Sequence, residues 1–390
     1  MTSAVSFEVA AVETLEQWPA PLRTYVAALM AHGTDAFADN LGCRAGIVRT
    51  SLGGWPFMRV EAGPEALSWT TSLTSQYLRH GGQQLDRIED PHARRLAAAA
   101  IRTLLSVSRL ARLDDVVQWS SLALSTNLHP ARTPEVVDEV TGALSSFYPD
   151  HAIVLRNLDA VATAPLMAAA VERGYQLVPS RVVHCYDGGE GEFMRRSTVR
   201  RDIRTLLPRE GYRFAERGEL GPSDVQRLLD LYHAVYITRH PGWNPRYRPR
   251  FIASALAEGW CEVMALRGPG GTIDATALVF RLGNEVCVPL VGHDITRPAR
   301  DGLYRHLVAE LLRRVAEQRL RLNYSSGADE FKRRRGGVPH LEFHAIYTRH
   351  LSTTRRSLYR SLFEAIEQVG RPHLDRLVRT PDGQPGRDDD

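Results

Sequence analysis

The chain has 390 residues, of which 43% are hydrophobic and 24% charged, and its formal net charge is +4. These values are close to those of ordinary globular proteins, which argues against a disordered or fibrous chain. No apolar run approaches the length of a membrane-spanning helix, and we expect no membrane partner. The chain is longer than one hydrophobic core usually serves, so two domains are expected.

Four cysteines, Cys43, Cys185, Cys261 and Cys287, are scattered along the chain without CxxC spacing. Free buried thiols account for them, and we assign no metal because no His or Cys pattern has ligand spacing. The first eleven residues lack the basic start and apolar core of a secretory signal. We therefore expect a cytoplasmic protein.

The first half of the chain mixes helical patterns with short strand patterns, and the two alternate from residue 134 onwards. The expected helices are residues 22–37, 91–110, 134–147 and 165–173, and the expected strands are residues 46–60 (two strands around a Gly-Gly turn), 151–156 and 175–186. Residues 187–191, Asp-Gly-Gly-Glu-Gly, are the best turn signal near the middle of the chain. They divide a predicted N-terminal domain, 1–190, from a C-terminal domain, 191–378. Residues 379–390 are expected to be a disordered tail.

The second half has a clearer pattern. The expected helices are residues 193–207, 223–238, 249–258 and 302–318, and the expected strands are residues 212–217, 260–267, 273–281, 285–292, 320–324 and 341–348. Glycine-containing turns separate the three strands between residues 260 and 292, which is typical of an antiparallel meander.

Lys332 is the only lysine among 49 basic residues. A lysine offers a compact ammonium whose pKa burial can shift, whereas an arginine stays charged as a planar fork. The residue follows a predicted strand, in a strand-to-helix turn of the kind that often holds binding or catalytic groups. The alternative is a surface lysine left by chance.

Arginines cluster in three segments of the second half, residues 195–204, 246–250 and 333–335. A solvated helix face explains any one of them, but three together favour an anionic ligand such as phosphate, a coenzyme or tRNA.

The order of elements in the second half, together with three motifs, resembles the Gcn5-related N-acetyltransferase (GNAT) superfamily and more closely its FemAB-like branch. The motifs are Val-Gly-His-Asp at 291–294, Asp-Gly-Leu-Tyr at 301–304 and Ser-Gly-Ala-Asp-Glu-Phe-Lys at 326–332. The resemblance covers residues 193–351, and in the first half only 152–186. It implies an α/β (α+β) fold of two tandem GNAT-like domains, each a mixed, mostly antiparallel sheet flanked by helices.

The resemblance implies transfer of an acyl or aminoacyl group from an activated donor to an amine or hydroxyl of a small acceptor, in a bacterial specialised pathway. Attack on the donor builds a tetrahedral oxyanion and releases a proton, so the site needs a base and a cation or hydrogen-bond donor. At the end of a strand, one of His293 and Asp294 points inward. We favour Asp294 as the base, with a loop cap as its alternative. Lys332 could neutralise the oxyanion or a donor phosphate, and Tyr304 could protonate the leaving group or simply pack in the core.

Acetyl-coenzyme-A-dependent relatives carry a glycine-containing phosphate turn before their long helix, whereas this chain has Arg297, Pro298 and Arg300 there. Neither arginine has the required spacing, and the proline removes an amide donor. Aminoacyl-tRNA is therefore the favoured co-substrate, with no bound cofactor; an acyl-CoA donor is the alternative, and a non-catalytic RNA- or partner-binding protein is the alternative of another class. The expected tRNA or phosphate contacts are Arg195, Arg196, Arg200, Arg201, Arg204, Arg333 and Arg334.

An aromatic and polar stretch, residues 232–247, could line an acceptor pocket or stabilise an ordered loop. Arginines and a serine at strand ends of the first half, Arg156, Ser180 and Arg181, could recognise phosphate or carboxylate or form salt bridges. The predicted substrate-binding residues are His293, Tyr236, Trp243, Asn244, Arg181 and Gly327.

Overall fold

A computed structural model of the chain describes residues 15–16, 18–60, 67–79, 90–129, 134–216, 218–239 and 242–379. The chain forms two compact units. Unit 1 comprises Met1–Ser180, Gly242–Arg246 and Glu342–Leu374, and unit 2 comprises Arg181–Pro241, Tyr247–Leu341 and Asp375–Asp390. Both units are thus discontinuous in sequence. The domain bounds 1–190 and 191–378 remain a proposal, and the predicted tail lies, except for Arg379, outside the described residues.

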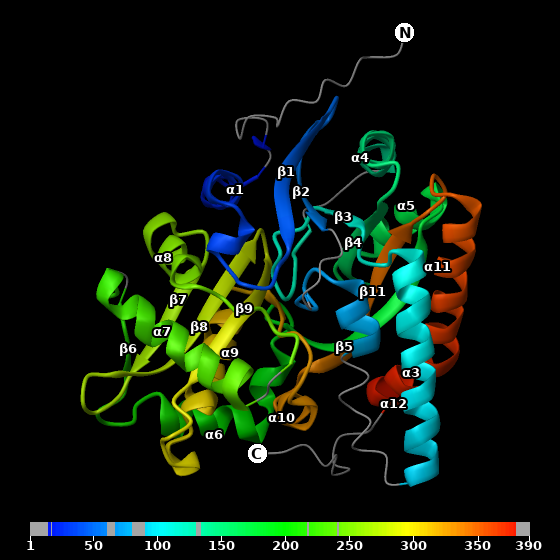
Figure 1. Ribbon diagram of the computed structural model, residues 1–390. Helices are drawn as coiled ribbons and strands as arrows, with labels where there is room; N and C mark the ends of the chain where they lie inside the picture. Colours follow the sequence, from blue (N-terminus) through cyan, green and yellow to red (C-terminus); the bar gives the residue numbers. More distant parts are fainter. Residues whose placement is uncertain are drawn as a thin grey trace. The chain divides into compact units, whose positions relative to one another are not determined.

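Unit 1 is built on the strands β1 (Cys43–Thr50), β2 (Gly53–Val60), β3 (Val116–Trp119), β4 (Ala152–Asp159) and β11 (Val338–Tyr347), in that spatial order. The strand β11 enters unit 1 at Glu342. The pair β3–β4 is parallel and the other pairs are antiparallel. The helices are α1 (Ala20–His32), η2 (Thr34–Ala36), η3 (Ser75–Arg79), α3 (Pro91–Ala111), α4 (Pro134–Phe147), α5 (Ala164–Arg173), α11 (Thr353–Ala365), η9 (Ile366–Gly370) and α12 (Arg371–Arg379), which runs from unit 1 into unit 2 (Figure 1).

The predicted helices of unit 1 are confirmed, with one change of length. Helix 22–37 ends early, because Gly33 has φ 75° and the chain continues as η2. Gly174 closes α5 in the left-handed conformation, at the predicted end of that helix. The strand β3 was not predicted, since four buried residues are too short a run for a periodic pattern.

Unit 2 is built on β5 (Gln176–Asp187), β10 (Arg321–Asn323), β9 (Glu285–His293), β8 (Ile273–Leu282), β7 (Glu262–Arg267) and β6 (Arg213–Phe214), in that spatial order. The chain enters unit 2 within β5, at Arg181. Only the pair β9–β10 is parallel. The helices are η5 (Glu192–Arg195), α6 (Ser197–Leu206), η6 (Pro222–Asp224), α7 (Val225–His233), η7 (Ala234–Arg239), α8 (Pro249–Glu258), η8 (Ala299–Asp301), α9 (Leu303–Glu317) and α10 (Asp329–Arg334).

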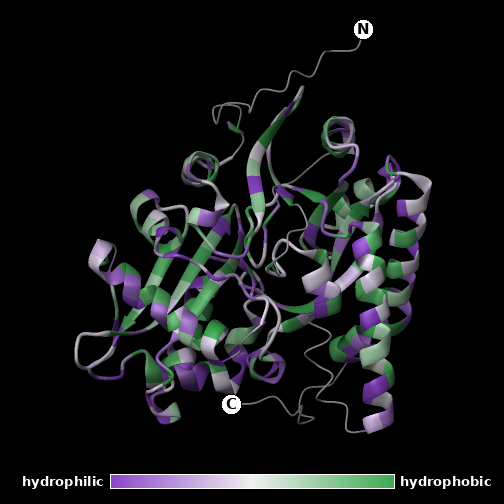
Figure 2. Cartoon of the chain, viewed as in Figure 1, coloured by the Kyte–Doolittle hydropathy of each residue, from purple (hydrophilic) through white to green (hydrophobic). Residues whose placement is uncertain are grey.

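Helices cover both faces of the unit 2 sheet. On one face, Leu307 and Leu311 of α9 and Val199 of α6 pack with apolar residues of β7–β10 in one core cluster. On the other face, α7 and α8 pack on β7–β9, and the close approach of α7 requires Gly292, whose added Cβ would lie 2.5 Å from the backbone of Leu231. The strands are accordingly hydrophobic and the helices are mixed (Figure 2). The predicted α/β class with mixed, mostly antiparallel sheets is confirmed.

Candidate functional site

The candidate site lies in unit 2, at the carboxyl ends of β9 and β10. These parallel strands pair only over residues 285–287 and 321–323, whereas β9 continues beside β8 to His293. The chain after β10 instead stays beside β5, because the Tyr324 amide donates to the carbonyl of His184 at 2.8 Å. The two strands therefore diverge. The carboxyl ends of parallel strands that part in this way are common ligand-binding positions.

Tyr304, in the first turn of α9, lies among aromatic side chains at these strand ends. Its ring centroid is 4.9 Å from that of Phe331, 6.1 Å from that of His293 and 6.5 Å from that of Tyr324. Burial raises the pKa of Tyr304 to about 12, although a hydrogen bond from the Tyr324 hydroxyl opposes the shift. Tyr304 is therefore protonated at neutral pH and can donate a proton.

His293 is the last residue of β9 and faces Tyr304. Its neighbour Gly292 packs against α7, so alternation along the strand sends the two residues to opposite faces. Burial lowers the pKa of His293, the charge of Arg239 lowers it further, and Asp294 opposes them. The imidazole is thus neutral at neutral pH and can accept a proton.

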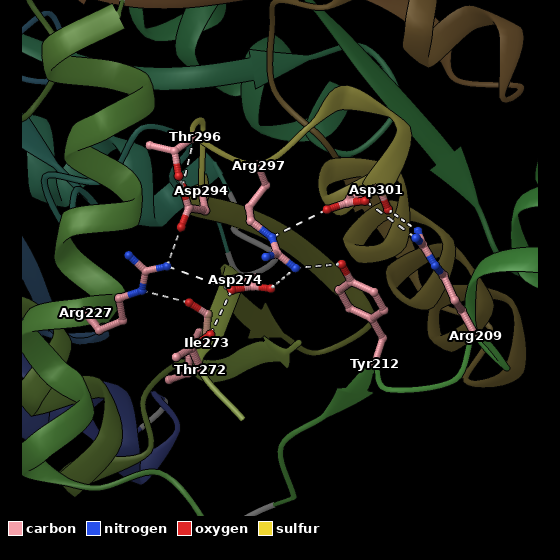
Figure 3. A network of polar contacts seen from close by, with 10 residues as sticks. All are labelled: Arg209, Tyr212, Arg227, Thr272, Ile273, Asp274, Asp294, Thr296, Arg297 and Asp301. Atoms are coloured by element: carbon pink, nitrogen blue, oxygen red, sulfur yellow. Dashed lines mark hydrogen bonds and ion pairs between the residues drawn. The ribbon is translucent and has the colours of Figure 1, made fainter. Parts of the chain in front are cut away.

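Asp294 takes part in a network of polar contacts with Thr296 and Arg227 (Figure 3). One carboxylate oxygen accepts hydrogen bonds from the Thr296 amide and hydroxyl at 2.9 and 2.6 Å, and the other accepts from Arg227 of α7 at 2.7 Å. Burial would raise the pKa of Asp294, but these hydrogen bonds outweigh it and lower the pKa to about 2. Such a carboxylate is a weak base. The geometry favours the loop-cap alternative for Asp294 and makes His293 the better candidate base.

The same network holds the connection from β9 to α9. Arg297 lies 3.5 Å from buried Asp274 and 3.4 Å from Asp301, and it donates to the Tyr212 hydroxyl at 3.3 Å. Arg209 in turn donates to the Asp301 carbonyl at 2.9 Å (Figure 3). Arg297, which stands in the predicted place of a phosphate turn, is therefore already paired with carboxylates of its own unit.

We expect the Asp294 network to make unit 2 sensitive to acid. Because the folded-state pKa of Asp294 is depressed, its contribution to stability is complete above the ordinary pKa of about 3.8 and is lost as the pH falls toward about 2. Asp294→Asn removes this contribution, so the variant should be less stable at neutral pH, by about 1 kcal/mol once solvent screening is allowed for. Denaturant unfolding at several pH values should show wild type and variant converging in acid. An equal gap at all pH values would contradict the shifted pKa.

Lys332 lies in α10 and is 3% exposed. Its ammonium donates to the backbone carbonyls of Tyr324 at 2.8 Å, Ser325 at 3.1 Å and Ser326 at 2.9 Å. Burial lowers the pKa of Lys332 to about 7, and the charge of Asp329 opposes the shift. The three donors of an ammonium match three converging acceptors, which a planar guanidinium does not. This geometry favours a positioning role for Lys332, while its predicted catalytic role stays a prediction.

The turn that Lys332 holds has an unusual backbone. Ser325, Gly327 and Ala328 have φ values of 57°, 79° and 50°, in the left-handed region that residues other than glycine rarely adopt. Such strain persists only where surrounding contacts enforce it. The hydrogen bonds of Lys332 supply those contacts, and the turn fixes where Tyr324 stands. Gly327 itself is exposed, and a Cβ added to it would meet nothing within 4 Å.

The predicted arginine contacts fall into two groups. Arg195, Arg196, Arg200, Arg201 and Arg204 are exposed on η5 and α6 or between them. The others belong to α10, where Arg334 pairs with Glu330 and Arg333 donates to the Leu377 carbonyl.

The third arginine of that run, Arg335, is buried, and it donates to Asp202 of α6 at 2.6 and 3.1 Å. Arg305 of α9 donates to the same carboxylate. This triad fixes α6 against α9 and α10 and leaves the arginines of α6 on the outer side.

The predicted substrate-binding residues do not form one group. Tyr236 stacks on Tyr232 in unit 2, with ring centroids 5.2 Å apart. Trp243 and Asn244 belong to unit 1, where Trp69 donates to the Asn244 side chain at 3.0 Å. Arg181 is buried in unit 2, and its charge contributes to lowering the pKa of Lys332. His240 of the same aromatic stretch lies outside the described residues.

Two residues near the site were not predicted. Tyr324 donates a hydrogen bond to Tyr304. His184 is fully buried and lies 3.5 Å from the Asp329 carboxylate. The sequence placed Tyr324 at the end of a strand beside the Ser-Ser-Gly turn, which was the available signal. Nothing local distinguishes His184 within its apolar strand.

The part of the chain that the structure describes contains no group of three or more His, Cys, Asp or Glu side chains placed to hold a metal ion. Within that same part, no helix combines the length and the apolar character needed to cross a membrane.

Residues 194–333 match the model of a known family, the acetyltransferase (GNAT) domain. His293, Tyr304, Tyr324 and Lys332 all lie within the matched range. This segment is a GNAT domain. The predicted relationship to that superfamily is confirmed for it, and with it an acyltransferase type of domain. No curated protein sequence matches the chain significantly.

Solved structures with low similarity to the chain include L-PGS from Bacillus licheniformis, with 15% identity and a TM-score of 0.41 over 58% of this chain and 77% of that one. A conserved protein of unknown function from Bacteroides thetaiotaomicron has 12% identity and a TM-score of 0.47 over 87% and 98% of the two chains. FemX has 8% identity and a TM-score of 0.44 over 83% and 91%. At these values the likenesses add nothing to the functional argument.

Proposed function

We propose that the GNAT domain transfers an aminoacyl group from aminoacyl-tRNA to an amine or hydroxyl of a small acceptor. The observation that carries the proposal is a neutral His293 beside the hydrogen-bonded pair Tyr304–Tyr324, at the carboxyl ends of two diverging strands. A base and an acid thus stand side by side, as acyl transfer requires.

The proposed reaction uses these groups in two steps. The acceptor nitrogen or oxygen bonds to the donor carbonyl carbon while His293 takes its proton, which gives a tetrahedral oxyanion. The bond from that carbon to the leaving oxygen then breaks, and Tyr304 gives its proton to this oxygen. Tyr324 donates a hydrogen bond to Tyr304 and stabilises the tyrosinate that forms. The protonated His293 then gives its proton through solvent to the Tyr304 tyrosinate, which restores both groups.

The choice of donor rests on charge. The connection before α9 contains Pro298 and pairs Arg297 with Asp274 and Asp301, so Arg297 is not free for a coenzyme pyrophosphate. Arg300 of the same connection is exposed, but it lacks the spacing of the phosphate turn in coenzyme-A-dependent relatives. By contrast, Arg200, Arg201 and Arg204 are exposed and share one side of α6. Exposed arginines without strong partners suit a nucleic-acid backbone.

An acyl-CoA-dependent reaction is the second candidate, because the matching family is described as an acetyltransferase domain. Incubation with charged tRNA pools and, separately, with acyl-coenzyme A mixtures, in the presence of candidate amines, distinguishes the donors. Loss of the aminoacyl ester only with acceptor present supports the proposal. Consumption of acyl-coenzyme A but not of aminoacyl-tRNA would identify acyl-coenzyme A as the donor. Binding of tRNA without turnover would indicate the non-catalytic alternative.

The α6 arginines provide a separate prediction. Replacing Arg200, Arg201 and Arg204 by Gln should weaken tRNA binding and reduce the slope of log affinity against log salt by about 0.7 to 0.9 per arginine that contacts a phosphate. Filter binding over a salt series measures both. Arg213→Gln is the matched control, because exposed Arg213 is already neutralised by Glu219 at 2.7 and 2.9 Å. Equal effects of both variants would contradict a role for α6.

We also propose a reducing, cytoplasmic setting, since Cys43, Cys185, Cys261 and Cys287 are all free and buried.

A further inference from the structure

Helix α3 of unit 1 carries an unusual set of side chains. Its 21 residues include Arg94, Arg95, Arg102 and Arg109 and no Asp or Glu. All four arginines are exposed, and none forms an ion pair with a described residue. Within the described part of the chain, the helix therefore presents positive charge that no carboxylate pairs with, outside the acyl-transfer site.

The charge follows a stripe along α3. Arg95, Arg102 and Arg109 follow at intervals of seven residues, so they lie nearly on one line, with about 10 Å between successive arginines. Leu96 and Leu110 follow the first and the last of them and border the same stripe. These leucines are 73% and 71% exposed, and they are among the most exposed large apolar side chains described.

Among the described residues, the buried positions of α3 lie at its C-terminal end. Ser108 and Ala111 are buried, and Arg355 of α11 donates to the Ala111 carbonyl at 3.0 Å. Toward the N-terminal end, residues 91–92, 94–96 and 99–100 are all exposed. The helix lies along α11, and hydrophilic and hydrophobic residues alternate on it (Figures 1 and 2). Because the N-terminal half of α3 is so lightly packed, it gains little stability from contacts with unit 1.

We propose that the exposed side of α3 docks on an anionic lipid surface. A helix in the interfacial plane places arginines against the lipid phosphates and leucines into the boundary of the acyl chains. An RNA backbone would use the arginines but would leave Leu96 and Leu110 in water, so the leucines favour lipid. This is a peripheral contact and not a span, and it revises the expectation of no membrane partner, which rested on the length of apolar runs.

The test uses the full-length protein and vesicles. Co-sedimentation with vesicles of phosphatidylglycerol and phosphatidylcholine in roughly equal parts should exceed that with phosphatidylcholine alone, and it should weaken as salt shortens the screening length. Arg95→Gln, Arg102→Gln and Arg109→Gln together should lower partitioning on the order of 100-fold. Leu96→Ser with Leu110→Ser should lower it with all arginines kept. Circular dichroism checks that each variant remains folded.

The α6 variant with Arg200, Arg201 and Arg204 replaced by Gln is the matched control, since it removes the same charge from unit 2. Unchanged vesicle binding in this control and loss in the α3 variants supports docking through α3. No preference for anionic vesicles, or equal loss in both sets, overturns the proposal. If tRNA binding rather than vesicle binding depends on the α3 arginines, the stripe is an RNA surface and the lipid proposal is wrong.

Discussion

Replacing His293 by Gln is expected to lower kcat/KM for acyl transfer roughly 100- to 10,000-fold, the usual contribution of a positioned general base. Burial and Arg239 hold the pKa of His293 below its ordinary value of 6.5. The wild-type rate should therefore be constant near neutral pH and fall on the acidic side of 6.5, as the imidazole is protonated. A plot of kcat/KM against pH measures this decline at low pH, the acidic limb of the profile. The acidic limb should be absent in His293→Gln.

Two neighbouring substitutions should move the acidic limb in opposite directions. Arg239→Gln removes a positive charge that lowers the pKa of His293, so the limb should shift to higher pH. Asp294→Asn removes a negative charge that raises it, so the limb should shift to lower pH. If the acidic limb persists in His293→Gln, or if its midpoint shifts in neither charge variant, the limb reports another group, such as the acceptor amine.

Much of unit 2 could be predicted because its patterns are long and local. Residues 302–318 were predicted as a helix and residues 273–281 as a strand, and the structure has α9 at Leu303–Glu317 and β8 at Ile273–Leu282. The short segment 242–246 could not be assigned in this way. Its place in unit 1 depends on long-range hydrogen bonds such as Asn40 to the Asn244 carbonyl, which no local pattern encodes.

The site shows the same limit at the scale of one residue. Alternation predicts that only one of His293 and Asp294 faces inward, but not which one. The choice is made by Gly292, which lets α7 approach one face of β9, and by Arg227 of α7, which binds Asp294. The lone lysine was informative in a different way: its rarity pointed to a position where an ammonium is needed, although the geometry favours positioning over catalysis.

Replacing Lys332 by Met is expected to destabilise the protein by about 3 to 5 kcal/mol and to abolish most turnover. The methionine keeps most of the apolar volume but leaves the carbonyls of Tyr324, Ser325 and Ser326 without their common donor. The turn should then relax, and Tyr324 should lose its place beside Tyr304. Denaturant unfolding measures the stability, and near-ultraviolet circular dichroism of the substrate-free protein reports the tyrosine environment.

Lys332→Arg is the matched variant that keeps the positive charge. A guanidinium cannot direct its planar donors at all three carbonyls, so this variant should also lose most turnover and change the tyrosine signal without substrate. A direct action of the charge on the oxyanion predicts otherwise. In that case Lys332→Arg retains substantial turnover, and Lys332→Met loses activity while its stability and tyrosine spectrum stay those of wild type. The substrate-free measurements therefore decide between a lysine that builds the site and one that acts in the reaction.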